Sequence, residues 1–169
     1  MSSYRLDELQ RGQCVTLLDD ILESPEIVAA VLETADGPRL AASNRDRGVD
    51  TFQVAALSAM LISLGNSLTG SRTPASHDVA ICDLKGSPMV VLPAGKALLS
   101  VIGRKGANMG LVVGIARNAA PRLAEIIARA PIDRPREEKK GFVFDADGFT
   151  ARVLKDVEER KHGLPEGGL

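Results

Sequence analysis

A glycine-rich, basic stretch has residue types more typical of a ligand-binding site than any other part of this sequence. Residues 103–110 read GRKGANMG and lead into a segment with helical periodicity. Glycines, basic side chains and the start of a helix together favour phosphate binding. The stretch lacks the Gly-Lys-Ser/Thr ending of a P-loop, and it does not have the GxGxxG spacing of a dinucleotide site. Because a tight strand-to-helix connection also needs glycines, a purely structural role stays open beside the phosphate interpretation.

The cysteines, histidines and acidic residues show no catalytic or metal-binding arrangement. There are two cysteines and two histidines, and all four are far apart in the sequence: Cys14, Cys82, His77 and His162. We interpret both cysteines as reduced packing residues, because a nucleophilic cysteine needs a base beside it and a zinc site needs more ligands. Residues 145–148 (DADG) begin like a calcium loop but lack the glutamate that closes one. We therefore expect no metal, no cofactor and no enzymatic activity.

Composition and charge are those of a globular domain whose charges are unevenly distributed. The chain has 169 residues, of which 44% are apolar, 25% charged and 3% aromatic, and its net charge is −1. A nucleic-acid-binding protein would carry a basic excess and aromatic stacking residues, so the sequence argues against that class. Residues 1–50 are acidic, residues 51–71 contain no charged side chain, and residues 72–131 are basic. No basic region followed by an apolar run opens the chain, so we expect a cytoplasmic protein.

Periodicity along the chain predicts eight elements. Apolar residues at helical spacing predict helices over residues 4–23, 51–69 and 108–130. Asn108 is the predicted N-cap of the last helix, and Pro121 should kink it. Apolar runs separated by short glycine turns predict five strands, at residues 27–34, 39–43, 78–84, 89–93 and 97–102. The order α-β-β-α-β-β-β-α, with its consecutive hairpins, predicts an α+β fold in which helices cover an antiparallel sheet.

The end of the chain differs in composition from the rest. About half of residues 132–162 are charged, and residues 132–140 have the composition of a linker. We therefore divide the chain into a domain at residues 1–131 and a tail at residues 132–169. The tail contains an amphipathic stretch whose apolar side consists of Phe149, Val153, Leu154 and Val157. Such a short helix is marginal alone in water, so we expect it to lie on its own domain or to bind a partner.

The second predicted helix has no charged side. Five residues form the stripe that we expect to face the sheet: Val54, Leu57, Leu61, Leu64 and Leu68. The opposite side carries six small or uncharged residues, which we expect to contact a second copy across a two-fold axis or a partner: Phe52, Ala55, Ala59, Ile62, Ser63 and Asn66. The alternative is that the tail of the same chain covers them. Polar residues in the run, such as Gln53 and Ser58, indicate a helix too polar to insert into a membrane.

Two segments of the sequence resemble the Roadblock family, also called the dynein light chain roadblock family. The first comprises the hairpin VLETADGPRLAAS and the uncharged helix QVAALSAMLISLGNSL, and the second is VAICDLKGSPMVVLPAGKALLSVI, followed by Asn108, Gly110 and Leu111. The resemblance covers residues 13–130 and rests on glycines and apolar alternation, while Pro121 and the tail depart from it. It implies a five-stranded antiparallel sheet with the first and third helices on one face and the second helix on the other. It also implies homodimers that join edge strands and pair their second helices.

The resemblance further implies a role in the control of small GTPases. Bacterial proteins of this kind resemble regulators of Ras-like small GTPases in polarity switches, and eukaryotic ones resemble motor adaptors and lysosomal scaffolds. We therefore expect a homodimeric regulator, without enzymatic activity of its own, that holds the catalytic residues of a Ras-like GTPase in place. Two alternatives remain: a scaffold that leaves nucleotide turnover unchanged, and a small-molecule sensor domain.

Overall fold

The elements of the structure follow one another in the predicted order. The computed structural model describes residues 6–69 and 79–130. Its elements are α1 (Glu8–Leu22), β1 (Ile27–Thr34), β2 (Arg39–Asn44), α2 (Thr51–Thr69), β3 (Ala80–Leu84), β4 (Ser87–Ala94), β5 (Ala97–Gly103) and α3 (Met109–Ala128). The α+β class predicted from the sequence is therefore confirmed.

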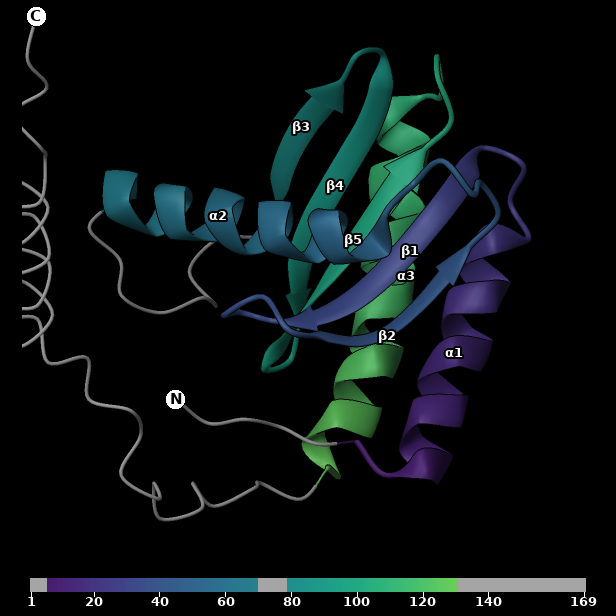
Figure 1. The fold of residues 1–169 in the computed structure, drawn as a ribbon, viewed down its shortest axis with the longest axis vertical. Coiled ribbons are helices and arrows are strands. Elements are labelled where there is room, and N and C mark those ends of the chain that lie inside the picture. The colour runs from purple at the N-terminus through teal and green to yellow at the C-terminus, as the bar shows by residue number, and fades with distance from the viewer. Residues whose placement is uncertain (1–5, 70–78, 131–169) are drawn as a thin grey trace, which may run out of the picture. The chain divides into compact units, whose positions relative to one another are not determined.

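The five strands form one antiparallel sheet in the order β2-β1-β5-β4-β3 (Figure 1). Strand β1 pairs with β5 over most of its length, with Ala30 opposite Val101, so the two halves of the chain meet inside the sheet. The register of β1 against β2 shifts between Leu32 and Glu33. Strands β2 and β3 each pair with a single neighbour, so their outer backbone groups form the two edges of the sheet.

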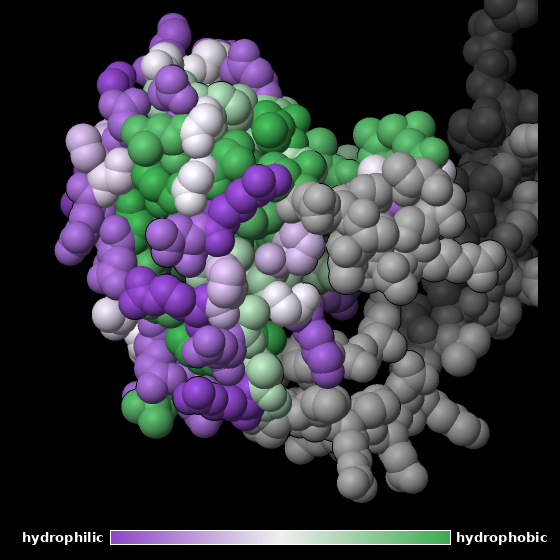
Figure 2. Space-filling model, turned by 180° about the vertical axis from the view of Figure 1, so that it is seen from behind, coloured by the Kyte–Doolittle hydropathy of each residue, from purple (hydrophilic) through white to green (hydrophobic). Residues whose placement is uncertain are grey.

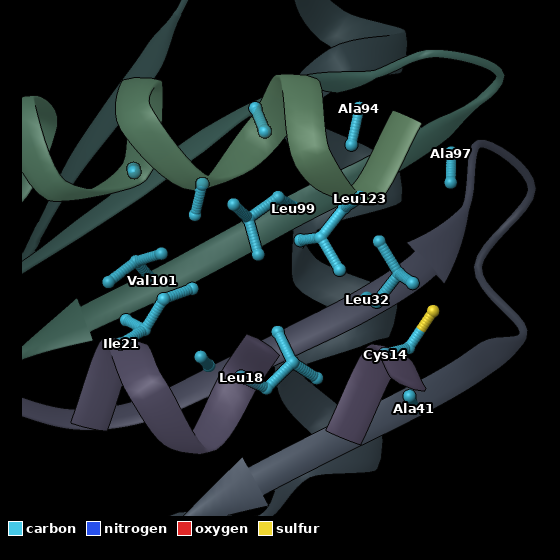
Figure 3. Packing of buried hydrophobic residues seen from close by; sticks show 14 of the residues in the cluster. Cys14, Leu18, Ile21, Leu32, Ala41, Ala94, Ala97, Leu99, Val101 and Leu123 are labelled. Atoms are coloured by element: carbon cyan, nitrogen blue, oxygen red, sulfur yellow. The ribbon is translucent and has the colours of Figure 1, made fainter. Parts of the chain in front are cut away.

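Helices cover the two faces of the sheet unequally. Helices α1 and α3 lie side by side on one face, and α2 lies alone on the other (Figure 1). On the first face, Leu18 of α1 and Leu123 of α3 belong to the same fully buried cluster as Leu32 and Leu99 of the sheet (Figure 3). Burial of a large aliphatic side chain contributes about 1.5–3 kcal/mol. This two-helix face therefore holds most of the core.

The starts of α1 and α3 are capped by side chains. Asp7 accepts the backbone N–H of Gln10, and the Gln10 side chain accepts the backbone N–H of Asp7, which forms a reciprocal capping box. Asn108 accepts the N–H of Leu111 at 3.1 Å, so the predicted cap of α3 is confirmed. Helix α3 continues through the exposed Pro121 as far as Ala128.

Apolar side chains of α2 pack against the sheet, although the helix is apolar enough by composition to cross a membrane. Among the described residues, Thr51–Leu68 is long and apolar enough to cross a membrane by length and composition alone. By this criterion, composition alone does not exclude a bilayer, contrary to the argument made from the sequence. In the structure, Val54, Ala55 and Ile62 pack in a second buried cluster with Val31 and other residues of the sheet. The helix thus forms one layer of the domain.

Gly103 occupies a position where the backbone leaves β5 between three close neighbours. An added Cβ would lie 2.8 Å from Pro88 Cγ, 2.9 Å from Ala107 Cβ and 3.0 Å from Val112 Cγ2. We expect Gly103→Ala to lower the free energy of unfolding by about 1–3 kcal/mol, because these neighbours must move. The matched control is Gly114→Ala, at an exposed helical site with nothing within 4 Å. It should raise stability by about 1 kcal/mol in urea denaturation, and similar effects of the two variants would contradict close packing at Gly103.

Candidate functional site

Helix α2 turns a stripe of uncharged side chains away from the sheet. Phe52, Met60, Leu64 and Leu68 are 65%, 68%, 57% and 78% exposed, and Ala56 between them is exposed as well. These residues recur every four positions, and residues 51–69 contain no charged side chain. We call Phe52, Ala56, Met60, Leu64 and Leu68 the outward stripe. Large apolar side chains gathered on one surface are typical of a contact with another molecule.

The buried side of α2 lies opposite the outward stripe and is made mainly of small residues. It comprises Thr51, Val54, Ala55, Ser58 and Ile62, each at most 9% exposed. Their spacing is that of one helical face. Small residues at the centre of this face bring the helix backbone close to the sheet.

The sequence predicted this helix correctly but predicted its rotation wrongly. Leu64 and Leu68, expected to face the sheet, belong to the outward stripe, whereas Ala55 and Ile62, expected to face outward, are buried. The remaining residues of the predicted contact surface are exposed or half-buried: Phe52 and Ser63 are exposed, Ala59 and Asn66 half-buried. Apolar residues surround the whole helix, so hydrophobicity alone does not fix its rotation. That these four exposed or half-buried residues contact a second copy of the chain or a partner stays a prediction.

Polar contacts fix the first turn of α2. The Asp50 carboxylate accepts the backbone N–H groups of Phe52 and Gln53 at 2.9 and 3.3 Å. The Arg39 guanidinium of β2 donates to the Thr51 hydroxyl and lies 3.8 Å from the centroid of the Phe52 ring. A cation over an aromatic face contributes about 0.5–1 kcal/mol at an exposed site. The stripe residue Phe52 is therefore held in position by the adjacent strand.

A chain of four oxygen atoms crosses the buried space between the sheet and α2. The Ser100 hydroxyl of β5 lies 2.5 Å from Glu33 Oε1 of β1 and 2.6 Å from the Ser58 hydroxyl of α2. The Ser58 hydroxyl lies 2.8 Å from the Val54 carbonyl oxygen. Glu33, Ser100 and Ser58 are all 0% exposed. The chain ties the middle of α2 to two strands of the sheet.

Glu33 is a buried carboxyl group without a charged partner in its hydrogen-bonded chain. Burial raises its pKa to about 8, although hydrogen bonds from Ser100 and Ser58 act in the opposite direction. Its second oxygen, Oε2, is buried and accepts no hydrogen bond. The sequence analysis missed this residue, which stands in the otherwise apolar strand IVAAVLET. A lone glutamate inside such a run was the available signal.

The glycine-rich stretch serves the fold. Arg104 forms an ion pair with Glu26, with Nη2 and Oε1 2.5 Å apart. Gly106 has a φ of +77°, which favours glycine, and Asn108 already occupies the start of α3 as its cap. Arg104, Gly106 and Asn108 therefore each have a structural role, and these contacts favour the structural interpretation over phosphate binding.

A cavity of about 510 Å³ lies beside the first half of α2. Its apolar wall includes Val54 and Leu57 of α2, and charged residues on its lining come from two loops: Asp46, Asp50, Arg104 and Lys105. Asp46 accepts the backbone N–H of Gly48, Asp50 caps α2 and Arg104 pairs with Glu26, so three of these four charged residues are engaged in holding the fold. The volume is within the range of small-molecule sites.

The residues that sequence analysis examined for nucleophilic or metal chemistry are not brought together. Both cysteines are free; Cys14 is fully buried, which raises its pKa to about 11 and disfavours the nucleophilic thiolate, and Cys82 is half-buried in β3. Within residues 6–69 and 79–130, no three His, Cys, Asp or Glu side chains form a group that would hold a metal ion. The remaining candidates lie outside the described residues: His77, His162, residues 145–148, and the tail residues Phe149, Val153, Leu154 and Val157.

Strand β3 adds a second exposed feature next to α2. It pairs with β4 alone, and its Ile81 is 53% exposed. The end of α2 extends toward and past this edge in the view of Figure 1. Figure 2 shows apolar surface on the side of the domain seen from behind as well. Outside α2, the exposed large apolar residues of the described part of the chain are Leu9, Ile81 and Leu111. Within the described sheet, no strand lies on the outer side of β3, and an edge of this kind is a template for a further strand.

Comparison with known proteins identifies the fold through structure alone. No protein-family model matches the sequence, and no curated protein sequence matches it. The gliding protein MglB from Thermus thermophilus has a similar structure, with a TM-score of 0.65 and 20% sequence identity over 76% of this chain and 98% of that chain. A Roadblock/LC7 domain from Streptomyces avermitilis matches with a TM-score of 0.59 and 20% identity, over 68% and 97% of the two chains.

A further MglB structure, described as having a tetrameric arrangement, gives a TM-score of 0.59 and 22% identity over 76% of this chain and 97% of that chain. Each likeness spans nearly the whole of the other protein. At sequence identities of 20–22%, similar structures show a shared fold and not a shared role. The described domain therefore has the Roadblock/LC7 fold.

The buried oxygen chain predicts unequal effects for two serines of the same helix. Ser58→Ala removes the link between α2 and Ser100, so we expect the free energy of unfolding to fall by about 1–3 kcal/mol. The matched control is Ser63→Ala, which lies on the exposed side of α2 and should change stability by less than about 0.5 kcal/mol. Urea denaturation measures both, and a Ser58 variant as stable as the Ser63 variant would contradict this role for the chain.

Proposed function

We propose that the protein is a non-enzymatic regulatory module that self-associates through the outward stripe of α2 and binds a Ras-like small GTPase in the cytoplasm. The observation that carries the proposal is the stripe itself, a row of exposed apolar side chains on a helix without any charge. The domain is similar in structure to MglB, named as a gliding protein, and to a Roadblock/LC7 domain, and this likeness supports a regulatory role. The structure of an MglB with a tetrameric arrangement supports self-association.

Pairing of two α2 helices across a two-fold axis fits the stripe. Met60 is the middle residue of the stripe, so in two antiparallel copies that cross there the two Met60 side chains meet at the two-fold axis. No charged side chain on α2 opposes this approach, and the apolar area leaves water on contact. The edge strand β3 lies beside α2 and offers a second contact, in which the β3 strands of two copies pair.

A charge introduced at the middle of the stripe tests self-association. We expect the wild-type protein to be a dimer and Met60→Glu to raise the dimer dissociation constant at least thirtyfold, about 2 kcal/mol, because two like charges meet at the axis. Asn118→Glu is the matched control, since it adds the same charge to an exposed site on α3. Sedimentation equilibrium measures both. A wild-type protein that remains a monomer at high micromolar concentration would contradict the proposal.

The GTPase part of the proposal has a separate test. The probe is the Ras-like GTPase encoded nearest to this gene in its source genome, purified and loaded with GDP or with a non-hydrolysable GTP analogue. We expect binding that depends on the nucleotide, together with a change in GTP turnover. Binding without any change in turnover would favour the scaffold alternative, and no binding in either state would remove the GTPase from the proposal.

A further inference from the structure

The oxygen chain beneath α2 contains more contacts than its hydroxyl groups can supply with protons. Three contacts link Glu33 Oε1, Ser100 Oγ, Ser58 Oγ and the Val54 carbonyl oxygen, at 2.5, 2.6 and 2.8 Å. Each hydrogen bond requires one proton, a carbonyl oxygen has none, and each serine supplies one. All three contacts are hydrogen bonds only if the third proton comes from the carboxyl group of Glu33.

The two protonation states of Glu33 therefore attach α2 to the sheet differently. When the carboxyl is neutral, Glu33 donates to Ser100, Ser100 donates to Ser58, and Ser58 donates to Val54. When it is ionised, Ser100 must donate to Glu33, and Ser58 has one proton for two acceptors, so either its link to Ser100 of the sheet or its bond to the Val54 carbonyl within α2 is lost. The ionised form also leaves negative charge on Oε2, which is buried and has no hydrogen-bond partner.

We propose that a proton on Glu33 holds α2 against the sheet, and that its loss frees the helix, so that the presentation of the outward stripe depends on pH. The inference rests on the proposed function in one respect, namely that the outward stripe is the contact surface. It goes beyond that function because it makes the position of the outward stripe depend on the protonation of Glu33, which lies beneath the opposite side of α2.

The charges around Glu33 do not replace the proton. Apart from Glu33, strands β1, β4 and β5 and helix α2 contain no charged residue. On β2, Arg39 stands opposite Glu33 in the register, but its guanidinium donates to Thr51 and covers the Phe52 ring. In the adjoining turns, Asp36 and Lys96 are exposed to solvent. Among the described residues, no charged side chain is therefore placed to pair with Glu33, and in the proposed seated form its carboxyl group is neutral because it is protonated.

The direction of the pH effect follows from the two environments of Glu33. Its pKa is about 8 when α2 is seated and 4.5, the ordinary value, when α2 is released into water. Between pH 4.5 and 8 the seated form holds a proton that the released form has lost. The ratio of released to seated helix therefore rises up to about tenfold per pH unit in this window and is constant above pH 8. Seating is firmest in acid.

Hydrogen exchange of the α2 backbone amides tests this inference in the full-length protein. The opening constant of α2, corrected for the intrinsic pH dependence of exchange, is measured from pH 6 to 9.5. In the wild type we expect a rise of up to about tenfold per unit to pH 8 and then a plateau. In Glu33→Gln, which is neutral at every pH, we expect a constant value. Glu125→Gln, which removes an exposed carboxylate from α3, should behave as the wild type.

A second measurement keeps the test independent of how well the Glu33 variant folds. The ¹³Cδ chemical shift of Glu33 in the wild type should titrate with a midpoint near 8. A midpoint near 4.5, or an opening constant with the same pH dependence in wild type and Glu33→Gln, would overturn the inference. Both readouts concern a single chain, so they stand even if sedimentation finds only monomers, a result that would refute the proposed self-association and leave the role of Glu33 intact.

Discussion

A single helix cannot cover one face of a five-stranded sheet, and this constraint determines which apolar surface the described domain exposes. Strands lie about 4.8 Å apart, so five span about 19 Å, whereas a helix with its side chains is about 10–12 Å across. Helices α1 and α3 together cover one face, and α2 alone lies on the other. Helix α2 therefore has sheet on one side and no other helix of the described domain packed upon it. The outward stripe is the result, because its residues are apolar on a surface that the described domain leaves open.

The position of α2 depends on polar groups as much as on apolar packing. Its apolar residues are distributed around the helix, so many rotations would bury similar area. The link from Ser58 through Ser100 to Glu33 selects one of them, because only this rotation places the Ser58 hydroxyl against the sheet. At the start of the helix, Asp50 and Arg39 add directional contacts. The buried hydrogen-bonded chain thus determines which uncharged side chains of α2 face away from the sheet.

The sequence was sufficient for the elements and insufficient for the way that α2 meets the sheet. Strand β1 was predicted with its observed bounds, and Asn108 was predicted as a cap, because alternation, glycine turns and capping residues are local signals. The rotation of α2 depends on a residue of β5, Ser100, that is distant in the chain, and no local pattern carries this information. Glu33 was overlooked for the same reason: its burial follows from α2, which covers it. The predicted contact residues Ala55 and Ile62 were misplaced with the helix.

The most direct test of the account is whether two copies of the chain place Met60 against Met60. A Met60→Cys variant in a Cys82→Ala background leaves the fully buried Cys14 as the other thiol. Two cysteines form a disulfide only when their Cα atoms are about 4.4–6.8 Å apart. Under mild oxidation, the account predicts a covalent dimer from Met60→Cys and none from Asn118→Cys in the same background. Equal cross-linking of the two variants, or none in either, would contradict an α2 contact centred on Met60.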